Sequence, residues 1–299
     1  MSFTRSVKRI PARRWDDLKA TWRRTAPTYE DVGAAPPVDV LDILEQNQSL
    51  LPLTGTEKEG RFDVPELRHL ILREGIFVLH KSAALLRSAS RDINAKQYTH
   101  AEITTYTGAV FAAKAVCIFL GVWFSPKKVS NDNWFLDCFS APHRGRYHTS
   151  AIRAQCNRIG HREVWLILQR IFRKSEHLPL DSQLVHLIID SSADQFAKHR
   201  NRIQYFNLRW YYDDLHGDDA TYSDWISPFT KDLYLGIDPD DENTHFGVLF
   251  FLMMLRAAHQ LFHEIASGTP GLQQELDLFY QNVSISTSTL YTDSWLHSA

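Results

Sequence analysis

Residues 194–205 bring together side chains that could act on a phosphodiester. Arg200 carries a planar guanidinium that can pair with two phosphate oxygens at once. Asn201 could orient the phosphate or a neighbouring side chain, and Tyr205 could donate its hydroxyl proton to a leaving oxygen. Cleavage of RNA without a metal ion also needs a base for the 2′-hydroxyl. Tyrosine, with an ordinary pKa of about 10, serves that purpose less well than histidine.

The spacing of these residues decides whether they can share a site. Arg200 and Tyr205 are five positions apart, which is about 140° around a regular helix. We expect them to share a cleft only where the helix bends or where a second copy of the chain completes the site. His199 could replace Tyr205 as the base, but on a regular helix it points about 100° away from Arg200.

Arg200 also has a structural interpretation. Residues 211–244 hold ten acidic residues against Lys231, a balance of −9, and Arg200 could pair with them. Tyr205 could equally be an aromatic side chain packed at a helix surface with a hydrated hydroxyl. Residues 194–205 are therefore interpreted either as a catalytic motif or as part of the structural framework.

The charge of the chain is strongly segregated, although the formal total is only −2. Residues 141–174 have a balance of +7, and residues 1–24 have a balance of +6. The first of these segments favours RNA binding, because guanidinium groups reach phosphates and Tyr147 or Trp165 could stack on a base. The candidate RNA-binding residues are Arg144, Arg146, Arg153, Arg158 and Arg162.

Pairing within the chain explains the same basic segment equally well. The balances of +7 and −9 are opposite in sign, so residues 141–174 could serve as a docking surface for residues 211–244. The two interpretations also combine. The acidic segment could occupy the basic groove and inhibit it until a partner displaces the acidic residues.

The sequence Asp194-Gln-Phe-Ala-Lys-His-Arg-Asn-Arg-Ile-Gln-Tyr205 resembles the motif of the HEPN superfamily, in which an Arg and a polar residue precede a His by four to six positions. Tyr205 stands in place of that His. Residues 106–115, rich in small side chains, are similar to the helix that often precedes the motif. The resemblance covers about residues 62–268. It implies a helical bundle, a cleft across a homodimer, and metal-independent endoribonuclease activity in toxin or antiphage defence systems.

The apolar spacing predicts four long helices, over residues 64–93, 99–123, 180–209 and 243–267. Shorter helices are predicted at residues 12–24, 38–47, 131–139, 159–174 and 272–281. Because no alternating apolar runs flank hairpin turns, the expected fold is all-α: a four-long-helix HEPN-like bundle with extra short helices. The expected organisation is an N-terminal part with a linker at 1–61, a helical domain at 62–282 and a tail at 283–299. The domain includes a basic insertion at 126–175 and an acidic segment at 210–244.

Composition excludes several classes of protein. Cys117, Cys138 and Cys156 form no CxxC pair, which suits a reducing cytoplasm and argues against a disulfide scaffold. His143 and His148 have no carboxylate or cysteine at metal-ligand spacing, so no metal or cofactor is expected. The longest nearly uncharged apolar stretch, residues 115–124, is too short to span a bilayer, and no secretion signal is recognised.

Two functions are consistent with these observations. The first is RNA cleavage or RNA binding through Arg200 in a prokaryotic defence or toxin system, by a cytoplasmic homodimer or protein complex. The second is a non-catalytic helical adaptor or sensor subunit of a multi-protein complex, which the tyrosine at position 205 favours. The resemblance adds a third, a small-nucleotide sensor, because some bundles of this kind bind nucleotides.

Overall fold

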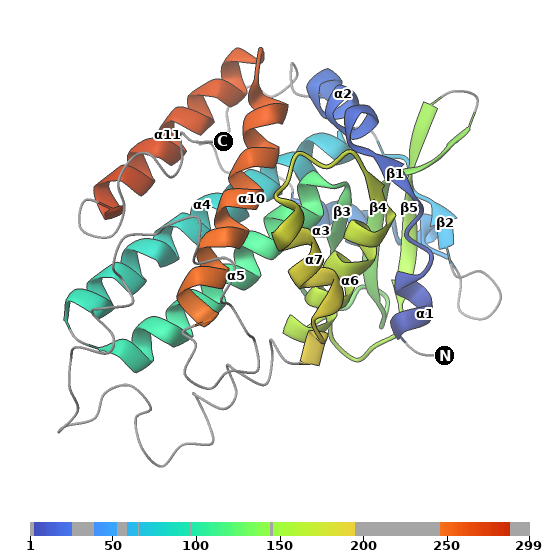
Figure 1. Cartoon of the computed structure of the whole chain (residues 1–299). Coiled ribbons are helices and arrows are strands. Elements are labelled where there is room, and N and C mark those ends of the chain that lie inside the picture. The colour runs from blue at the N-terminus through green and yellow to red at the C-terminus, as the bar shows by residue number, and fades with distance from the viewer. Residues whose placement is uncertain are drawn as a thin grey trace.

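A body of long helices and a four-stranded antiparallel sheet contribute to the same hydrophobic core in the computed structural model of the chain (Figure 1). The structure describes residues 3–25, 39–52, 59–64, 66–95, 97–143, 146–194 and 246–287. The prediction of an all-α fold is therefore wrong, and the architecture is mixed α and β. The long helices lie on the left of Figure 1, and the sheet lies on the right beside the N-terminal segment.

The helical body consists of α4 (Leu67–Asn94), α5 (Tyr98–Phe119), α10 (Phe246–Ala266) and α11 (Pro270–Thr287). α5 packs against both α4 and α10, and α11 packs against α4. The helices predicted at residues 64–93 and 243–267 correspond to α4 and α10 to within a few residues. The helix predicted at residues 99–123 ends earlier, because Val122–Phe124 form a strand. The short helix predicted at 272–281 is the longer α11.

The helix predicted over residues 180–209 is interrupted in the structure, where α7 (Ser182–Asp190) ends at Asp190 and residues 193–194 are helical again, and residues 195–209 lie outside the described residues. α7 is followed by Ser191, whose backbone is extended. Asp181 caps the start of α7, because its side chain accepts a hydrogen bond from the backbone N–H of Gln183 at 2.8 Å. The predicted catalytic motif at residues 200–205 lies outside the described residues, as does the whole of 195–245.

α5 and α10 approach each other closely at Gly108. A Cβ at position 108 would lie 2.4 Å from Cζ of the fully buried Phe251. We expect Gly108→Val to lower the free energy of unfolding by about 1 to 3 kcal/mol, because a close-packed interface cannot absorb the added atoms without strain. Urea denaturation measures the change, with Thr107→Val, a nearly isosteric substitution at a half-buried neighbour, as the control. Equal midpoints for the two variants would contradict this prediction.

The sheet is formed by β2 (Glu59–Arg61), β3 (Val122–Phe124), β4 (Asn133–His143) and β5 (Arg146–Ala154). Its strand order is β2-β5-β4-β3, and every neighbouring pair is antiparallel. The register places Phe135 of β4 opposite Ile152 of β5 and Phe124 of β3. β4 and β5 continue to the pair His143 and Arg146, well past the ends of β2 and β3. The basic insertion therefore contains a long hairpin.

The prediction of a short helix at residues 131–139 is wrong, because residues 133–139 belong to β4. Residues 133–140 are all buried, so the strand lacks the alternation of apolar and polar residues that marks a half-exposed strand. An uninterrupted apolar run such as Trp134-Phe-Leu136 is compatible with a helix as well as with a buried strand. The pair Arg144-Gly145, between the sequences of β4 and β5, is the feature that could have indicated a hairpin, because two-residue connections ending in glycine are typical of these turns.

The N-terminal segment lies on the sheet side of the molecule and comprises α1 (Phe3–Val7), β1 (Arg13–Arg14) and α2 (Trp15–Thr25). β1 pairs in parallel with β6 (Ser175–Glu176), which directly follows α6 (His161–Lys174). Trp15, Leu18 and Trp22 are buried, as their helical spacing predicted. α3 (Val40–Gln46) packs on α4 and is followed by a 3-10 helix, η2 (Gln48–Leu50).

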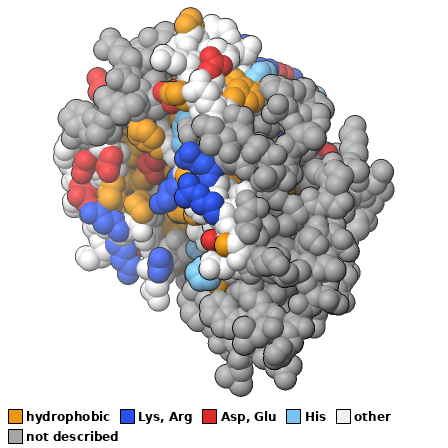
Figure 2. All heavy atoms as spheres, turned by 90° about the vertical axis from the view of Figure 1, so that its left-hand side faces the viewer, with side chains coloured by type: hydrophobic (Ala, Val, Ile, Leu, Met, Phe, Trp, Pro, Cys, Tyr) orange, Lys and Arg blue, Asp and Glu red, His pale blue; other side chains and the backbone are white. Residues whose placement is uncertain are grey.

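The face of the molecule on the left of Figure 1 carries both signs of charge (Figure 2). Lys and Arg side chains gather there beside hydrophobic ones, and Asp, Glu and His side chains lie nearby.

Among the helices that the structure describes, none has the length and apolarity needed to cross a membrane.

Candidate nucleic-acid interface

Among the residues that the structure describes, the predicted site residues are not brought together. Arg200, Asn201 and Tyr205 lie outside the described residues, and so do Arg144 and the acidic residues 211–244. Arg146 begins β5, where it pairs with His143 of β4.

Arg153 is a structural residue and is not free to bind RNA. Its Nε lies 3.0 Å from the carboxylate of Asp132, and its Nη2 donates a hydrogen bond to the carbonyl of Pro52 at 3.2 Å. The guanidinium carbon lies 5.7 Å from the ring centre of Trp134. These contacts tie β5 to Asp132 before β4 and to Pro52 before β2, and they balance the charge of Arg153.

The two remaining arginines of the predicted set differ in how they are paired. Arg162 donates to the carboxylate of Asp194 and lies 3.6 Å from that of Glu163, and the hydrogen bond to Asp194 raises its pKa. Its charge is therefore largely balanced. Arg158 is exposed, and the described residues provide no ion-pair partner for it.

The aromatic side chains expected to stack on bases are also engaged within the chain. Trp165 is fully buried and packs against Phe250, with ring centres 5.1 Å apart. Tyr147 donates a hydrogen bond from its hydroxyl to the carboxylate of Asp17 at 3.1 Å. Burial raises the pKa of Tyr147, and the carboxylate of Asp17 raises it further. Stacking of RNA bases on Trp165 is therefore excluded by its burial.

The structure instead brings the two basic segments together, which the sequence did not reveal. α1 contacts both α6 and β5, and β1 pairs with β6. From α6, Arg170 donates through Nη2 to the backbone carbonyls of Lys8 and Ile10 at 2.7 and 3.0 Å. Residues 3–14 therefore run alongside α6, more than 140 positions away in sequence.

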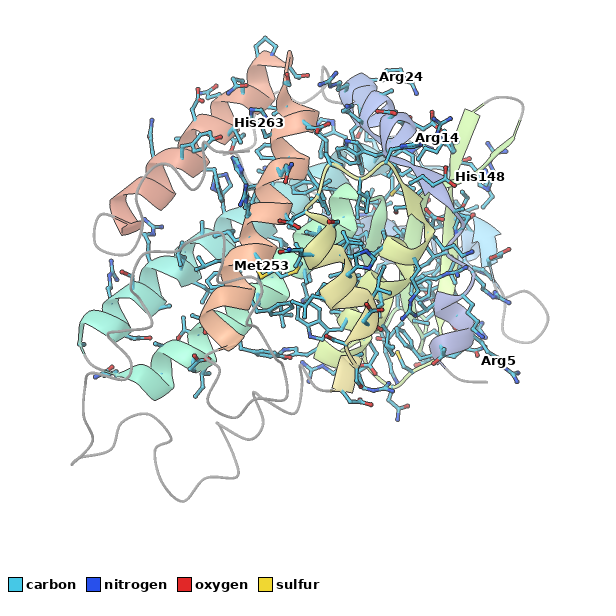
Figure 3. All side chains as sticks on the ribbon, viewed as in Figure 1. Arg5, Arg14, Arg24, His148, Met253 and His263 are labelled. Carbon is cyan, nitrogen blue, oxygen red and sulfur yellow. The ribbon has the colours of Figure 1, made fainter. Side chains whose placement is uncertain are left out.

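We call a set of cations on this side, from α1, β1, the connection between them and α6, the basic strip, and its members are Arg5, Lys8, Arg14, Arg170, Arg173 and Lys174. All except Arg170 are exposed. Figure 3 shows Arg5 and Arg14 at separate points along the N-terminal segment, on the right of the molecule. The acidic residue Glu176 lies next to the strip, opposite Arg14 in the β1–β6 ladder.

Several arginines of this region bond to neutral groups and therefore keep their net charge. Arg170 bonds to two carbonyls, and Arg173 donates to the carbonyl of Ile189 at 2.6 Å. A carbonyl dipole satisfies the donors of a guanidinium without cancelling its charge. Burial lowers the pKa of Arg170, and the neighbouring charges of Arg13 and Arg173 lower it further.

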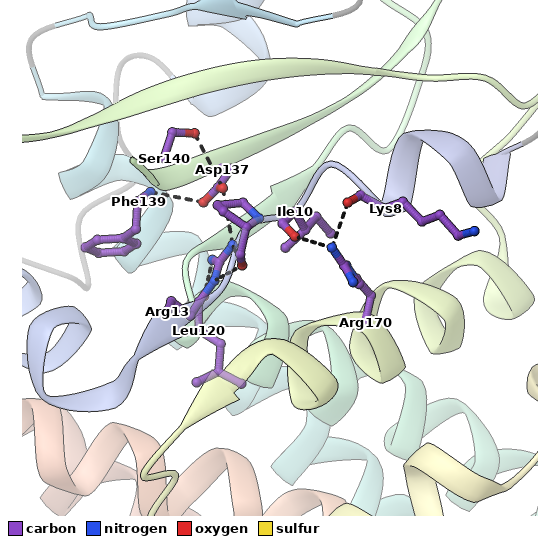
Figure 4. Close-up of polar contacts among 9 residues, drawn as sticks. Lys8, Ile10, Arg13, Leu120, Asp137, Phe139, Ser140 and Arg170 are labelled. Atoms are coloured by element: carbon purple, nitrogen blue, oxygen red, sulfur yellow. Dashed lines mark hydrogen bonds and ion pairs between the residues drawn. The ribbon is translucent and has the colours of Figure 1, made fainter. Parts of the chain in front are cut away.

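A buried ion pair holds the N-terminal part of the strip in place (Figure 4). Arg13 donates through Nη1 to the carbonyl of Leu120 at 2.8 Å and through Nη2 to Oδ2 of Asp137 at 3.2 Å. Asp137 also accepts a hydrogen bond from the backbone N–H of Phe139 at 3.0 Å. The side chains of Arg13 and Asp137 are 2% and 0% exposed. β1 is therefore joined to β4 and to the end of α5.

The described residues offer little support for other kinds of site. They contain no group of three or more His, Cys, Asp or Glu side chains that could hold a metal ion. Cys117 and Cys138 are buried, and burial raises the pKa of both thiols, that of Cys138 to about 12. Neither thiol is available as a thiolate nucleophile at neutral pH.

Comparisons of the chain with protein-family models, curated proteins and solved structures found no match.

Proposed function

We propose that this protein binds RNA through the basic strip, which contacts the phosphates of the RNA backbone. The observation that carries the proposal is the convergence of the basic N-terminal segment with α6 of the second basic segment on one side of the fold. Lysine and arginine contacts to phosphates provide most of the affinity of sequence-independent nucleic-acid binding. A cytoplasmic location belongs to the same proposal, because all three cysteines are free thiols.

The proposal includes RNA cleavage as its catalytic part, in a prokaryotic defence or toxin system. Arg200, Asn201 and Tyr205 would act on the phosphodiester without a metal ion, as the resemblance to HEPN proteins implies. The sheet departs from the all-α bundle of that superfamily, so support for catalysis comes from the motif alone. The choice of RNA over DNA follows from the chemistry of that motif, which requires a 2′-hydroxyl as nucleophile.

RNA binding is tested by removing four exposed cations of the basic strip together, at Arg5, Lys8, Arg173 and Lys174, each replaced by glutamine. For single-stranded RNA, log K falls with log salt by about 0.7 per phosphate contact. We therefore expect the slope of log K against log salt to be less negative by up to about 3 for the fourfold variant than for the wild type. Fluorescence anisotropy with a labelled RNA, measured over a range of salt concentrations, gives both slopes.

The matched control removes the same number of charges from other elements, with glutamine at Arg61, Arg91, Lys127 and Lys128. All four are exposed and lie on β2, α4 and the β3–β4 connection. We expect this control to retain the slope of the wild type. Equal losses in both variants, or no binding by the wild type, would contradict a role for the basic strip.

Catalysis is tested separately with Arg200→Ala on total RNA in the presence of EDTA. Loss of cleavage with unchanged RNA binding supports the catalytic part. Cleavage that survives in Arg200→Ala contradicts it. RNA binding without cleavage by the wild type supports the non-catalytic adaptor, which also predicts stable co-purification with a partner protein.

A further inference from the structure

The outer end of the β4–β5 hairpin extends beyond the rest of the sheet. β2 pairs with β5 as far as Ser150, and β3 pairs with β4 as far as Asp137. Among the strands that the structure describes, β4 and β5 alone continue, and they pair with each other as far as His143 and Arg146. Figure 1 shows this end of the hairpin projecting from the body of the protein beside α2. We call residues 140–148 the hairpin arm.

The base of the hairpin arm is fixed to α2 and α4. The backbone carbonyl of Tyr147 accepts a hydrogen bond from Nη2 of Arg68 in α4 at 2.5 Å, and its hydroxyl donates one to Asp17 in α2 at 3.1 Å. On β4, the ring centre of Phe139 lies 5.9 Å from that of Tyr147 and 5.2 Å from that of Trp22 in α2. An isolated two-stranded hairpin is only marginally stable in water. These contacts therefore hold the arm in a fixed direction.

The hairpin arm is basic and contains no acidic residue. Its sequence, Ser140-Ala-Pro-His-Arg-Gly-Arg-Tyr-His148, holds two arginines and two histidines. The base of the arm lies near Arg14 of the basic strip. Burial and then Asp17 raise the pKa of Tyr147, and the positive charge of Arg14 acts in the opposite direction. The arm therefore continues the basic strip beyond the body of the protein.

The sequence of the hairpin arm argues against pairing with a strand of another protein. A strand that adds to the edge of a sheet needs a free row of N–H and C=O groups. Pro142, in the outer part of β4, has no N–H to offer. Proline and positive charge on an edge strand are features that prevent such pairing. A polyanion is a better partner for the arm than a second strand.

The aromatic side chains at the hairpin arm do not favour single-stranded RNA as that polyanion. Proteins that bind single strands stack the bases on aromatic rings. Tyr147 is the only Phe, Tyr or Trp of the arm, and it packs on Phe139 and bonds to Asp17. A duplex needs no such platform, because its bases remain paired and it presents phosphates on both sides of a groove.

We propose that the hairpin arm lies across a groove of double-stranded RNA and contacts its phosphates, an inference that rests on the proposed function. Double-stranded RNA is recognised largely by shape, through phosphates and 2′-hydroxyls across its wide, shallow minor groove. Paired strands are about 4.8 Å apart, and a ribbon of this width with a fixed base fits such a groove. The basic strip binds the backbone of any RNA, and the arm adds a preference for duplexes.

Fluorescence anisotropy of the full chain with a labelled RNA duplex, and with an unstructured single strand of the same length, measures this preference. We expect the wild type to bind the duplex at least about 10-fold more tightly than the single strand. Arg144→Gln combined with Arg146→Gln should weaken duplex binding by about 10- to 100-fold, the effect of losing a charge-assisted hydrogen bond. The affinity of this variant for the single strand should be nearly unchanged.

Two further variants separate the charge of the hairpin arm from its fold. Arg144→Lys combined with Arg146→Lys keeps both charges and should retain most of the affinity for the duplex. Lys127→Gln combined with Lys128→Gln is the matched control. It removes two exposed cations from the connection that leads into the opposite end of β4, and it should bind both RNAs as the wild type does.

Failure of this inference can be distinguished from failure of RNA binding itself. Equal binding of the two RNAs by the wild type, or unchanged duplex binding by the glutamine variant, overturns the role of the arm and leaves the basic strip in place. No binding of either RNA contradicts the proposed function and this inference with it. Tighter binding of a DNA duplex of the same sequence contradicts the choice of RNA. A homodimer that the glutamine variant dissociates would show that the arm contacts a second copy of the chain, and would also overturn the inference.

Discussion

Replacing Arg13 by methionine is expected to lower the free energy of unfolding by about 3 to 5 kcal/mol. The substitution leaves the carboxylate of Asp137, which is 0% exposed, without its cation. The carbonyl of Leu120 also loses a donor at 2.8 Å. An uncompensated buried charge costs much more than the loss of a surface ion pair. Urea denaturation, monitored by circular dichroism, measures the change.

The neighbouring residue offers a matched control for this prediction. Arg14 is exposed and has the same charge, so Arg14→Met should change the free energy of unfolding by less than about 0.5 kcal/mol. The double variant Arg13→Met with Asp137→Leu should recover much of the lost stability, because it removes both charges of the buried pair. A midpoint for Arg13→Met equal to that of Arg14→Met would show that the Arg13–Asp137 contact does not hold β1 in place.

Glu74→Gln is expected to stabilise the protein by about 3 kcal/mol at pH 8 and to have little effect near pH 4. Burial raises the pKa of this carboxyl from 4.5 to about 7. The folded state therefore holds the proton more tightly than the unfolded state. Stability is fully present below about pH 4.5 and falls as the pH rises through about 7, by about 1.4 kcal/mol for each unit of the shift. The glutamine keeps an acceptor for Trp123 and removes the titration.

The measurement for Glu74 is the free energy of unfolding of both proteins across this pH range. Glu45→Gln removes a much more exposed carboxylate and serves as the control, with no comparable gain expected at pH 8. If Glu74→Gln instead destabilises the protein at pH 8 and not near pH 4, the carboxylate is needed in its charged form, for example by Lys114, and the prediction is contradicted. The size of the difference between the two pH values is therefore the decisive quantity.

The helices could be predicted from sequence because each buries one regularly spaced face. Trp15, Leu18 and Trp22 follow the helical period in α2, and Leu67 and Ile71 do so at the start of α4. The sheet could not be predicted in this way. β4 is buried from residue 133 to residue 140, so it shows no alternation, and an apolar run of that length is compatible with either element.

The sequence predicted that the candidate interface would be basic, but it did not predict which of its arginines would be exposed. Residues 1–24 and 141–174 are visibly basic in the sequence. Whether a given arginine faces solvent depends on partners that are distant in the chain or on a small local detail. Asp132 neutralises Arg153 across the base of the hairpin, and Arg13 is buried while its neighbour Arg14 is exposed. Such differences arise only when the strands and helices have come together.

The N-terminal segment makes its contacts with parts of the chain that are synthesised much later. Arg13 bonds to Asp137, which lies 124 positions onward, and the indole N–H of Trp15 donates to the carboxylate of Glu264, 249 positions onward. At about 5 to 20 residues per second, a ribosome needs about 12 to 50 s to make that intervening chain. The first helices therefore leave the ribosome long before their partners exist, and the apolar faces of α2 have to stay unaggregated during that interval.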